Sequence, residues 1–294
     1  MSTLQNKIDF AAIIFVKNAN PNGDPLNGNR PRVDYNGRGE ISDVCIKRKI
    51  RNRLQENGFS IFVQSDNNRV DSYPSLKSRV EGELSKEEMK EEKKFSEAAC
   101  KKWMDVRAFG QVFAYAGESK GAGVSIGIRG PVSIHPAFSV APVLDRISSI
   151  QITKSVSGEG DGSKRASDTM GMKHRVDHGV YIFYGSINPQ LASKTGFSDE
   201  DANAIKKALV TLFRDDASSA RPEGSMEVFR VYWWKHNTNN GQYSSAKVHR
   251  TVESRIKLKE GIEEPQSIHD YVIPEKSEID KDLPGLACEI LEGE

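Results

Sequence analysis

The sequence IDFAAIIFVK at Ile8–Lys17 is rich in β-branched and aromatic residues, and it predicts a buried strand. It runs into NANPNGDPLNGNRPRVDYNGRGE at 18–40, where Asn, Pro and Gly favour turns over helix. A long loop inside a compact domain is usually functional or disordered. Beyond it, Ser42 has the features of a helix N-cap, and a predicted helix ends near Gly58. Its apolar stripe comprises Ile46, Ile50 and Leu54.

Further strands and helices are predicted along the chain. Glu83–Trp103 is rich in Glu and Lys and predicts an inserted helical element, whereas 66–85 is polar and irregular. The amphipathic pattern after Ser198 predicts a helix to Phe213. Strands are predicted at 59–63, 124–134, 147–155, 180–187 and 227–234, with a long hairpin excursion at 157–171. This order favours an α+β fold of the ferredoxin-like, RNA-recognition-motif (RRM) type.

Composition excludes several classes of protein. The 294 residues are 37% hydrophobic and 28% charged, which is enough apolar material for a core and excludes wholesale disorder. The longest apolar run, Phe10–Val16, is too short to span a membrane. The opening MSTLQNKIDF lacks signal-peptide features, so we expect a cytoplasmic protein. The three cysteines match no zinc or disulfide spacing and are expected to be buried thiols: Cys45, Cys100 and Cys288.

Charge is distributed unevenly although the formal net charge is only +1. Residues 253–294 carry a formal charge of −7, which leaves +8 on the rest of the chain. Five cations occupy seven positions of the predicted helix, with Asp43 the only acid nearby, so a phosphate partner is as plausible as a solvated helix face. Neighbours three and four residues apart lie about 5–6 Å apart on a helix, a spacing that suits successive phosphates. The five cations are Lys47, Arg48, Lys49, Arg51 and Arg53.

The sequence gives less support for a catalytic site than for a phosphate-binding helix. His174 and His178 would share one face of an extended strand, roughly 13 Å apart, which favours ordinary surface or loop roles over an acid–base pair. Asp24 and Asp34 could position a metal or a 2′-hydroxyl, but Asp beside Gly or Pro more often makes a turn. The glycines at 121–127 lack the following helix that a dinucleotide site requires. No metal or cofactor is expected.

Two methionines flank Gly171 in a polar stretch at the end of the hairpin excursion. Unbranched Met170 and Met172 could wedge between unstacked bases. Cations surround them in the sequence: Lys164, Arg165, Lys173 and Arg175. A nucleic-acid contact at this end of the hairpin excursion is therefore a hypothesis that the pattern allows.

Five blocks of the sequence resemble one family. NANPNGDPLNGNRPRVD (18–34), followed by ISDVCIKRKIR (41–51), resembles the Cas seven (Cas7) backbone subunit of type I-C CRISPR Cascade. DVRAFGQ (105–111), SIGIRGPV (125–132) and MGMKHRVDHGVYIFYGSIN (170–188) are similar to later blocks of that family. The resemblance covers spaced patches from 8 to 236. It implies an RRM-like palm at 1–65 and 105–236, a helical insertion at 66–104 and a β-hairpin thumb at 156–175, and it leaves 237–294 as an acidic C-terminal tail.

The resemblance also implies an RNA-binding surface. Cations of the palm helix would line the guide backbone, and the thumb would reach across the guide onto a neighbouring copy and displace a base. The residues that match the family's RNA-contacting blocks are Arg30, Arg32, Ser42, Lys47, Arg48, Arg51, Arg107, Phe109, Gln111, Lys164, Arg165, Met170, Met172, Lys173 and His174.

The implied function is that of a filament-forming scaffold. Copies would polymerise head-to-tail along the CRISPR RNA (crRNA), grip its phosphates without reading bases, and leave recognition of target DNA to base pairing. Further implied partners are the Cas five, Cas eight and small subunits of type I-C Cascade; no enzymatic activity and no membrane are expected. Two alternatives stay open: an endoribonuclease that uses the two histidines or the loop aspartates, and a generic single-strand RNA-binding protein.

Overall fold

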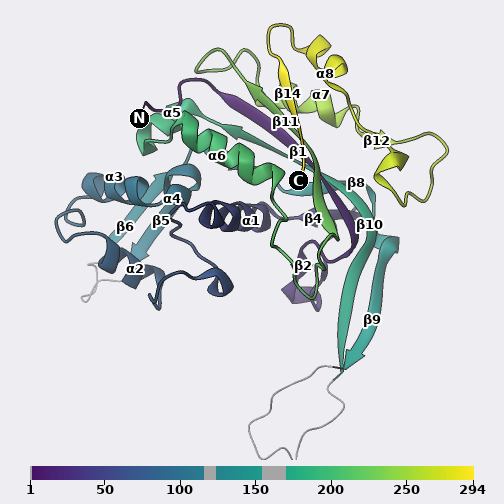
Figure 1. The fold of residues 1–294 in the computed structure, drawn as a ribbon, viewed down its shortest axis with the longest axis horizontal. Helices are drawn as coiled ribbons and strands as arrows, with labels where there is room; N and C mark the ends of the chain where they lie inside the picture. Colours follow the sequence, from purple (N-terminus) through teal and green to yellow (C-terminus); the bar gives the residue numbers. More distant parts are fainter. Residues whose placement is uncertain (1, 116–123, 154–169) are drawn as a thin grey trace, which may run out of the picture.

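A computed structural model describes residues 2–115, 124–153 and 170–294, and its central feature is an antiparallel sheet (Figure 1). Within these residues the strand order is β14-β11-β1-β10-β8-β4, and β7 and β9 also pair with β10. The strands are β1 Ile8–Ala19, β4 Arg38–Ile41, β7 Val132–Ile134, β8 Ala137–Pro142, β9 Ile147–Thr153, β10 Met170–Ile187, β11 Met226–Lys235 and β14 Cys288–Glu292.

The centre of the sheet has the predicted topology. β1 pairs antiparallel with β10 on one side and with β11 on the other, and Ile8 lies opposite Ile187 and Lys235. The order β11-β1-β10-β7/β8, with one helix after β1 and another after β10, is the ferredoxin-like arrangement. The expected α+β, RRM-like fold class is therefore confirmed.

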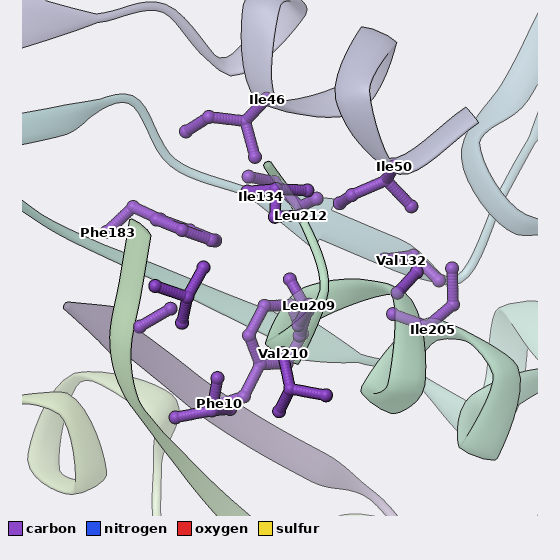
Figure 2. Close-up of a cluster of buried hydrophobic side chains, with 14 of the residues drawn as sticks. Phe10, Ile46, Ile50, Val132, Ile134, Phe183, Ile205, Leu209, Val210 and Leu212 are labelled. Atoms are coloured by element: carbon purple, nitrogen blue, oxygen red, sulfur yellow. The ribbon is translucent and has the colours of Figure 1, made fainter. Parts of the chain in front are cut away.

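Two helices cover one face of the sheet. α1, Asp43–Glu56, begins where Ser42 Oγ accepts a hydrogen bond from Cys45 N, and α6, Asp199–Val210, begins with a capping box at Ser198. Figure 2 shows Ile46 and Ile50 of α1 meeting the side chains of α6 and of the sheet. The short helix α5, Pro189–Thr195, precedes α6. Among the described helices, none is long and apolar enough to cross a membrane.

Residues 237–294, which the resemblance left as an acidic tail, are folded. They contain α7 Ser245–Glu253, β12 Lys257–Leu258, β13 Tyr271–Val272, α8 Lys276–Asp282 and the edge strand β14. They cover the second face of the sheet, where Val248, Val252 and Ile279 are buried. β11 consequently buries side chains on both faces: Trp233 faces the α1–α6 layer and Trp234 faces the C-terminal layer. The buried apolar residues of this segment are widely spaced in an acidic, proline-rich stretch, so they form no recognisable periodic pattern in the sequence.

The insertion has its own small core and differs in detail from prediction. α2 Leu76–Glu83, α3 Glu92–Lys102, α4 Met104–Phe109, β5 Gly110–Tyr115 and β6 Val124–Arg129 surround Phe62, Phe95, Trp103 and Phe113. The helix predicted at 83–103 is interrupted at 84–91, and α2 lies in the stretch predicted to be irregular. The strand predicted at 59–63 is absent from this described segment, because the N–H groups of Phe62 and Val63 donate to the carboxylate of Asp105.

Candidate nucleic-acid interface

The glycine-rich segment 18–40 forms two tight turns. β2, Gly23–Asp24, pairs with β3, Arg30–Pro31, and Asp24 Oδ1 accepts from Leu26 N at 3.2 Å. In the second turn Asp34 Oδ1 accepts from Asn36 N and Arg38 N, both at 2.9 Å. Desolvation opposes ionisation of Asp34, but hydrogen bonds from Arg38 outweigh it and lower the pKa of Asp34. Both loop aspartates are therefore engaged in turns.

The first turn packs against the start of α1. Asn22 Oδ1 accepts from Ser42 N at 2.9 Å, and its backbone carbonyl accepts from Arg32 N at 3.0 Å. Arg32 Nη2 lies 3.5 Å from Asp24 Oδ1, and the Arg32 side chain is about one-third exposed. Asn22 thus fixes the loop to the helix N-terminus, and the predicted residues Arg32 and Ser42 lie close together.

A second link joins the loop to the projecting hairpin. β9 and β10 pair from Ile147↔Val176 to Thr153↔Met170, forming a two-stranded ribbon that leaves the sheet (Figure 1). Arg30 Nη1 donates to Ser149 Oγ at 3.3 Å, and Ser149 Oγ is 2.7 Å from His174 Nδ1. The structure therefore brings the predicted residues Arg30 and His174 together through Ser149.

The ribbon separates the predicted thumb residues between two faces. Met172, 54% exposed, lies on the same face as His174, because residues two apart on a strand point the same way. Lys173 lies on the opposite face, across from Ile150. Lys164 and Arg165 lie outside the described residues, and of Met170 only the backbone is described. The stem of this hairpin also begins earlier than the predicted 156–175.

Each of the five basic residues of α1 has a partner among the described residues. Lys49 and Arg53 are buried; Lys49 pairs with Asp216, and Arg53 pairs with Glu56 within α1. The shortage of acids near these cations in the sequence is thus made up by tertiary contact, since Asp216 lies 167 residues away from Lys49 along the chain. The remaining three also have partners: Lys47 pairs with Asp43 at 2.9 Å, Arg51 with Asp105 at 3.0 Å, and Arg48 Nη1 donates to Val63 O at 2.6 Å.

The exposed edge of α1 nevertheless keeps basic character. Val44 is 69% exposed, and Lys47 and Arg48 are half-buried on the same helix face, three and four residues further on. The ion pair between Lys47 and Asp43 is an ordinary surface pair, which a phosphate can replace at little cost. These two cations remain the accessible part of the predicted palm-helix site.

The third predicted block lies apart from the loop. Arg107 donates two hydrogen bonds, each 2.8 Å, to the Asp201 carboxylate and so joins α4 to α6. The ring of Phe109 lies 5.0 Å from the Arg51 guanidinium, which places Phe109 beside α1. Gln111 lies on β5, where its amide donates to Val112 O at 2.9 Å. Phe109 thus adjoins the helix, while Arg107 has a structural contact.

The two histidines do not come together. His178 is 4% exposed and packs between Phe15 and Tyr271, with ring centroids 5.3 Å and 5.8 Å away. Within the described residues neither ring nitrogen has a hydrogen-bond partner. Burial, with a smaller contribution from Arg146, lowers the pKa of His178 to about 4. In the described part of the chain, no group of three or more His, Cys, Asp or Glu side chains could hold a metal.

Three residues that organise this surface escaped the sequence analysis: Asn22, Asp105 and Ser149. Each acts through polar contacts with residues in other elements of the fold, and no local pattern distinguishes such a residue. The only available signal was that two of them lie inside or beside the blocks quoted above, Asn22 in 18–34 and Asp105 in 105–111.

Comparison with known proteins places this geometry in context. The family model described as "CRISPR-associated protein Cas7" matches residues 6–275. A curated relative from Haloferax volcanii, "CRISPR-associated protein Cas7", is 28% identical over 217 residues, which are 70% of this chain and 63% of the relative. The match therefore spans less than two-thirds of that relative's length.

Two solved structures share the fold. A chain of a "CRISPR RNA-guided surveillance complex" gives a TM-score of 0.52 at 15% identity, covering 98% of this chain and 89% of that chain. A chain of a "CRISPR RNA-guided surveillance complex, pre-nicking" gives 0.50 at 14% identity, covering 94% of this chain and 87% of that chain. At these identities the likeness concerns the fold alone.

Proposed function

The chain belongs to the CRISPR-associated Cas7 family, and on that premise we propose that it is a crRNA-binding backbone subunit of a type I-C Cascade surveillance complex. It grips the phosphates of the guide and leaves the bases free to pair with a target DNA strand. Its partners are the crRNA, further copies of itself, the target strand, and the Cas five, Cas eight and small subunits. The complex acts in the cytoplasm in antiviral defence.

The observation that carries this proposal is the contact from Arg30 through Ser149 to His174. It ties the glycine-rich loop to the β9–β10 ribbon, while Asn22 ties the same loop to α1. A continuous surface results, along which accessible cations recur: Arg30, Arg32, Lys47 and Arg48. Such a row suits a ribose-phosphate backbone, because guanidinium and ammonium groups bind phosphate irrespective of base.

Filament formation supplies the second part of the proposal. Because the Cas7 chain is asymmetric, copies that repeat along one RNA must meet through heterologous, head-to-tail contacts. The β9–β10 ribbon projects from the body and is the element that reaches a neighbouring copy. Met172, exposed on the face that carries His174, is the residue proposed to displace a base.

The alternative, an endoribonuclease, has less support. His178 is buried without access to a substrate, and Asp24 and Asp34 are committed to turns. We therefore propose a scaffold without a cleavage step. Incubation of the purified chain with labelled RNA, with and without divalent metal, tests this point: cleavage that disappears in His174→Ala would favour the enzyme.

Salt dependence of RNA binding tests the proposal most simply. The wild type should bind two single-stranded RNAs of unrelated sequence equally well, and log–log salt plots should have the same slope. Each phosphate contact removed should flatten that slope by about 0.7, so Lys47→Ala combined with Arg48→Ala should flatten it by about 1.4. Lys90→Ala, which removes an exposed lysine paired with Glu87 in the insertion, is the matched control. An unchanged slope in the double variant would remove α1 from the site.

A further inference from the structure

One aromatic side chain on the surface is fully solvent-exposed in a hydrogen-bonded turn. Tyr35 has a relative exposure of 110%, so its side chain is open to solvent. Single exposed apolar residues are ordinary on protein surfaces. Tyr35 differs in that several hydrogen bonds fix the backbone of the turn that carries it.

The turn that carries Tyr35 is locked by hydrogen bonds on both sides. Asp34 accepts from Asn36 N, Arg38 N and Arg38 Nε, each at 2.9 Å, and its backbone carbonyl accepts from Gly37 N at 3.1 Å. Gly37 has a φ of 74°, a conformation that other residues adopt at a cost. The ring is consequently presented from a rigid support, and ordering it on binding costs little entropy.

The same turn is anchored at the root of the projecting ribbon. Gly37 O accepts from Val143 N at 2.8 Å and from Leu144 N at 3.1 Å. Leu144 opens the short 3₁₀ turn Leu144–Arg146 that leads directly into β9. Tyr35 is therefore fixed beside the point where the ribbon leaves the sheet.

One cation of the proposed RNA-binding surface, Arg32, lies on the stem of this turn. Arg32 precedes Tyr35 by three residues on a stem closed by Asp34 N donating to Arg38 O at 2.8 Å and by Glu40 N donating to Arg32 O at 2.9 Å. Proteins bind single-stranded nucleic acid by combining cations, which take the backbone, with aromatic rings, on which bases stack.

We propose that Tyr35 is a stacking platform for one unpaired nucleobase, of the guide RNA or of the strand that pairs with it. The inference rests on the proposed RNA-binding function and adds to it a contact with a base face that does not depend on base identity. Stacking tolerates every base, since each has a π-face, so it remains compatible with a guide of any sequence. A protein partner covering the ring is the competing occupant.

Abasic RNA separates stacking from every phosphate contact. The full chain is titrated with a single-stranded RNA and with an RNA of the same length that lacks bases, using Tyr35→Ala, Tyr35→Leu and Tyr35→Phe. We expect Tyr35→Ala and Tyr35→Leu to bind the normal RNA about tenfold more weakly, with an unchanged salt slope, and Tyr35→Phe to bind like the wild type. On abasic RNA all four proteins should bind equally. Adding a complementary strand that is abasic at single positions distinguishes a guide base from a target base.

Two results would overturn the inference. One is equal binding of normal RNA by the wild type and Tyr35→Ala, with or without the complementary strand. The other is an equal loss on normal and abasic RNA, which would show that the ring does not act through a base. A change in self-association without RNA in the same variant would assign the ring to a protein contact instead. Failure of the wild type to bind any RNA would instead contradict the proposed function itself. Because the ring is uncovered, unchanged unfolding midpoints should verify that all variants fold.

Discussion

Arg51 donates from Nε to Oδ2 of Asp105 over 3.0 Å, and that carboxylate is completely buried. The same carboxylate accepts from Phe62 N at 2.7 Å and from Val63 N at 3.0 Å. The pair joins the proposed RNA-binding helix α1 to α4 and to the chain that enters the insertion. Arg51 therefore holds α1 in place against α4 and residues 62–63, in addition to any phosphate contact that α1 makes.

Replacing Arg51 by Ala should destabilise the whole protein. It leaves a buried carboxylate without its cation, which typically costs about 3–5 kcal/mol. Urea denaturation should show the free energy of unfolding falling by that amount. Lys47→Ala, which removes a half-buried surface pair with Asp43, should change it by about 0–1 kcal/mol. Equal effects of the two variants would contradict the assignment.

Arg107 should tolerate lysine poorly. Its guanidinium forms two parallel hydrogen bonds to Asp201, whose Oδ2 also accepts from Ser198 N in the cap of α6. A lysine ammonium cannot reproduce this fork, so Arg107→Lys should lose about 1–3 kcal/mol of unfolding free energy. Thermal unfolding measures it, with Lys235→Ala, an exposed partner of Asp199, as the control. If the lysine variant were as stable as the wild type, the positive charge alone, and not the two parallel hydrogen bonds, would account for the contribution of Arg107 to stability.

Stability should fall on acidification because of His178. Burial lowers its folded pKa to about 4, while the unfolded chain protonates near pH 6.5. Between these values the unfolded state binds more protons than the folded state. The contribution of His178 to the free energy of unfolding is therefore fully present above pH 6.5 and is lost as the pH falls towards 4. The loss attributable to this residue should be about 2–3 kcal/mol. His178→Phe should flatten that part of the profile in urea titrations at pH 7, 6 and 5; an unchanged profile would contradict the burial of a neutral ring.

The sequence predicted those elements whose apolar periodicity or capping residues lie within the element itself. The apolar run of β1 and the cap with its stripe at Ser42, Ile46 and Ile50 specify a strand and a helix, and the structure contains both. The pattern after Ser198 likewise became α6. The loop and the helix are adjacent in the chain, and Asn22 joins them through its contact with Ser42 N.

What the sequence could not supply are the partners contributed by distant segments. Lys49 and Arg53 resembled free cations because Asp216 and Asp215 lie more than 160 residues away. Residues 237–294 resembled a tail because a layer of two short helices and three short strands spreads few apolar residues over a long acidic stretch. A polar group that is buried by a tertiary contact shows no periodic pattern in the sequence by which it could be recognised.

The C-terminal layer should detach when Asp9 is lost. Asp9 is fully buried on β1 and accepts from His236 Nε2 at 2.9 Å, while Lys7 Nζ lies 3.1 Å away. His236 Nδ1 in turn accepts from Gln242 N at 2.9 Å, which connects the sheet to the start of that layer. Asp9→Ala should lower the free energy of unfolding by about 2–5 kcal/mol and accelerate proteolysis within 237–294. Asp199→Ala, at an exposed pair, is the control; resistance to protease equal to the wild type would contradict this account.

Native mass spectrometry on a ladder of RNA lengths tests the central claim most directly. Copies of the purified chain should add one at a time as the RNA lengthens by a constant number of nucleotides, with the same step for homopolymeric and mixed sequences. A single bound copy at every length, or steps that depend on the sequence, would contradict a backbone subunit that grips phosphates and assembles along its guide.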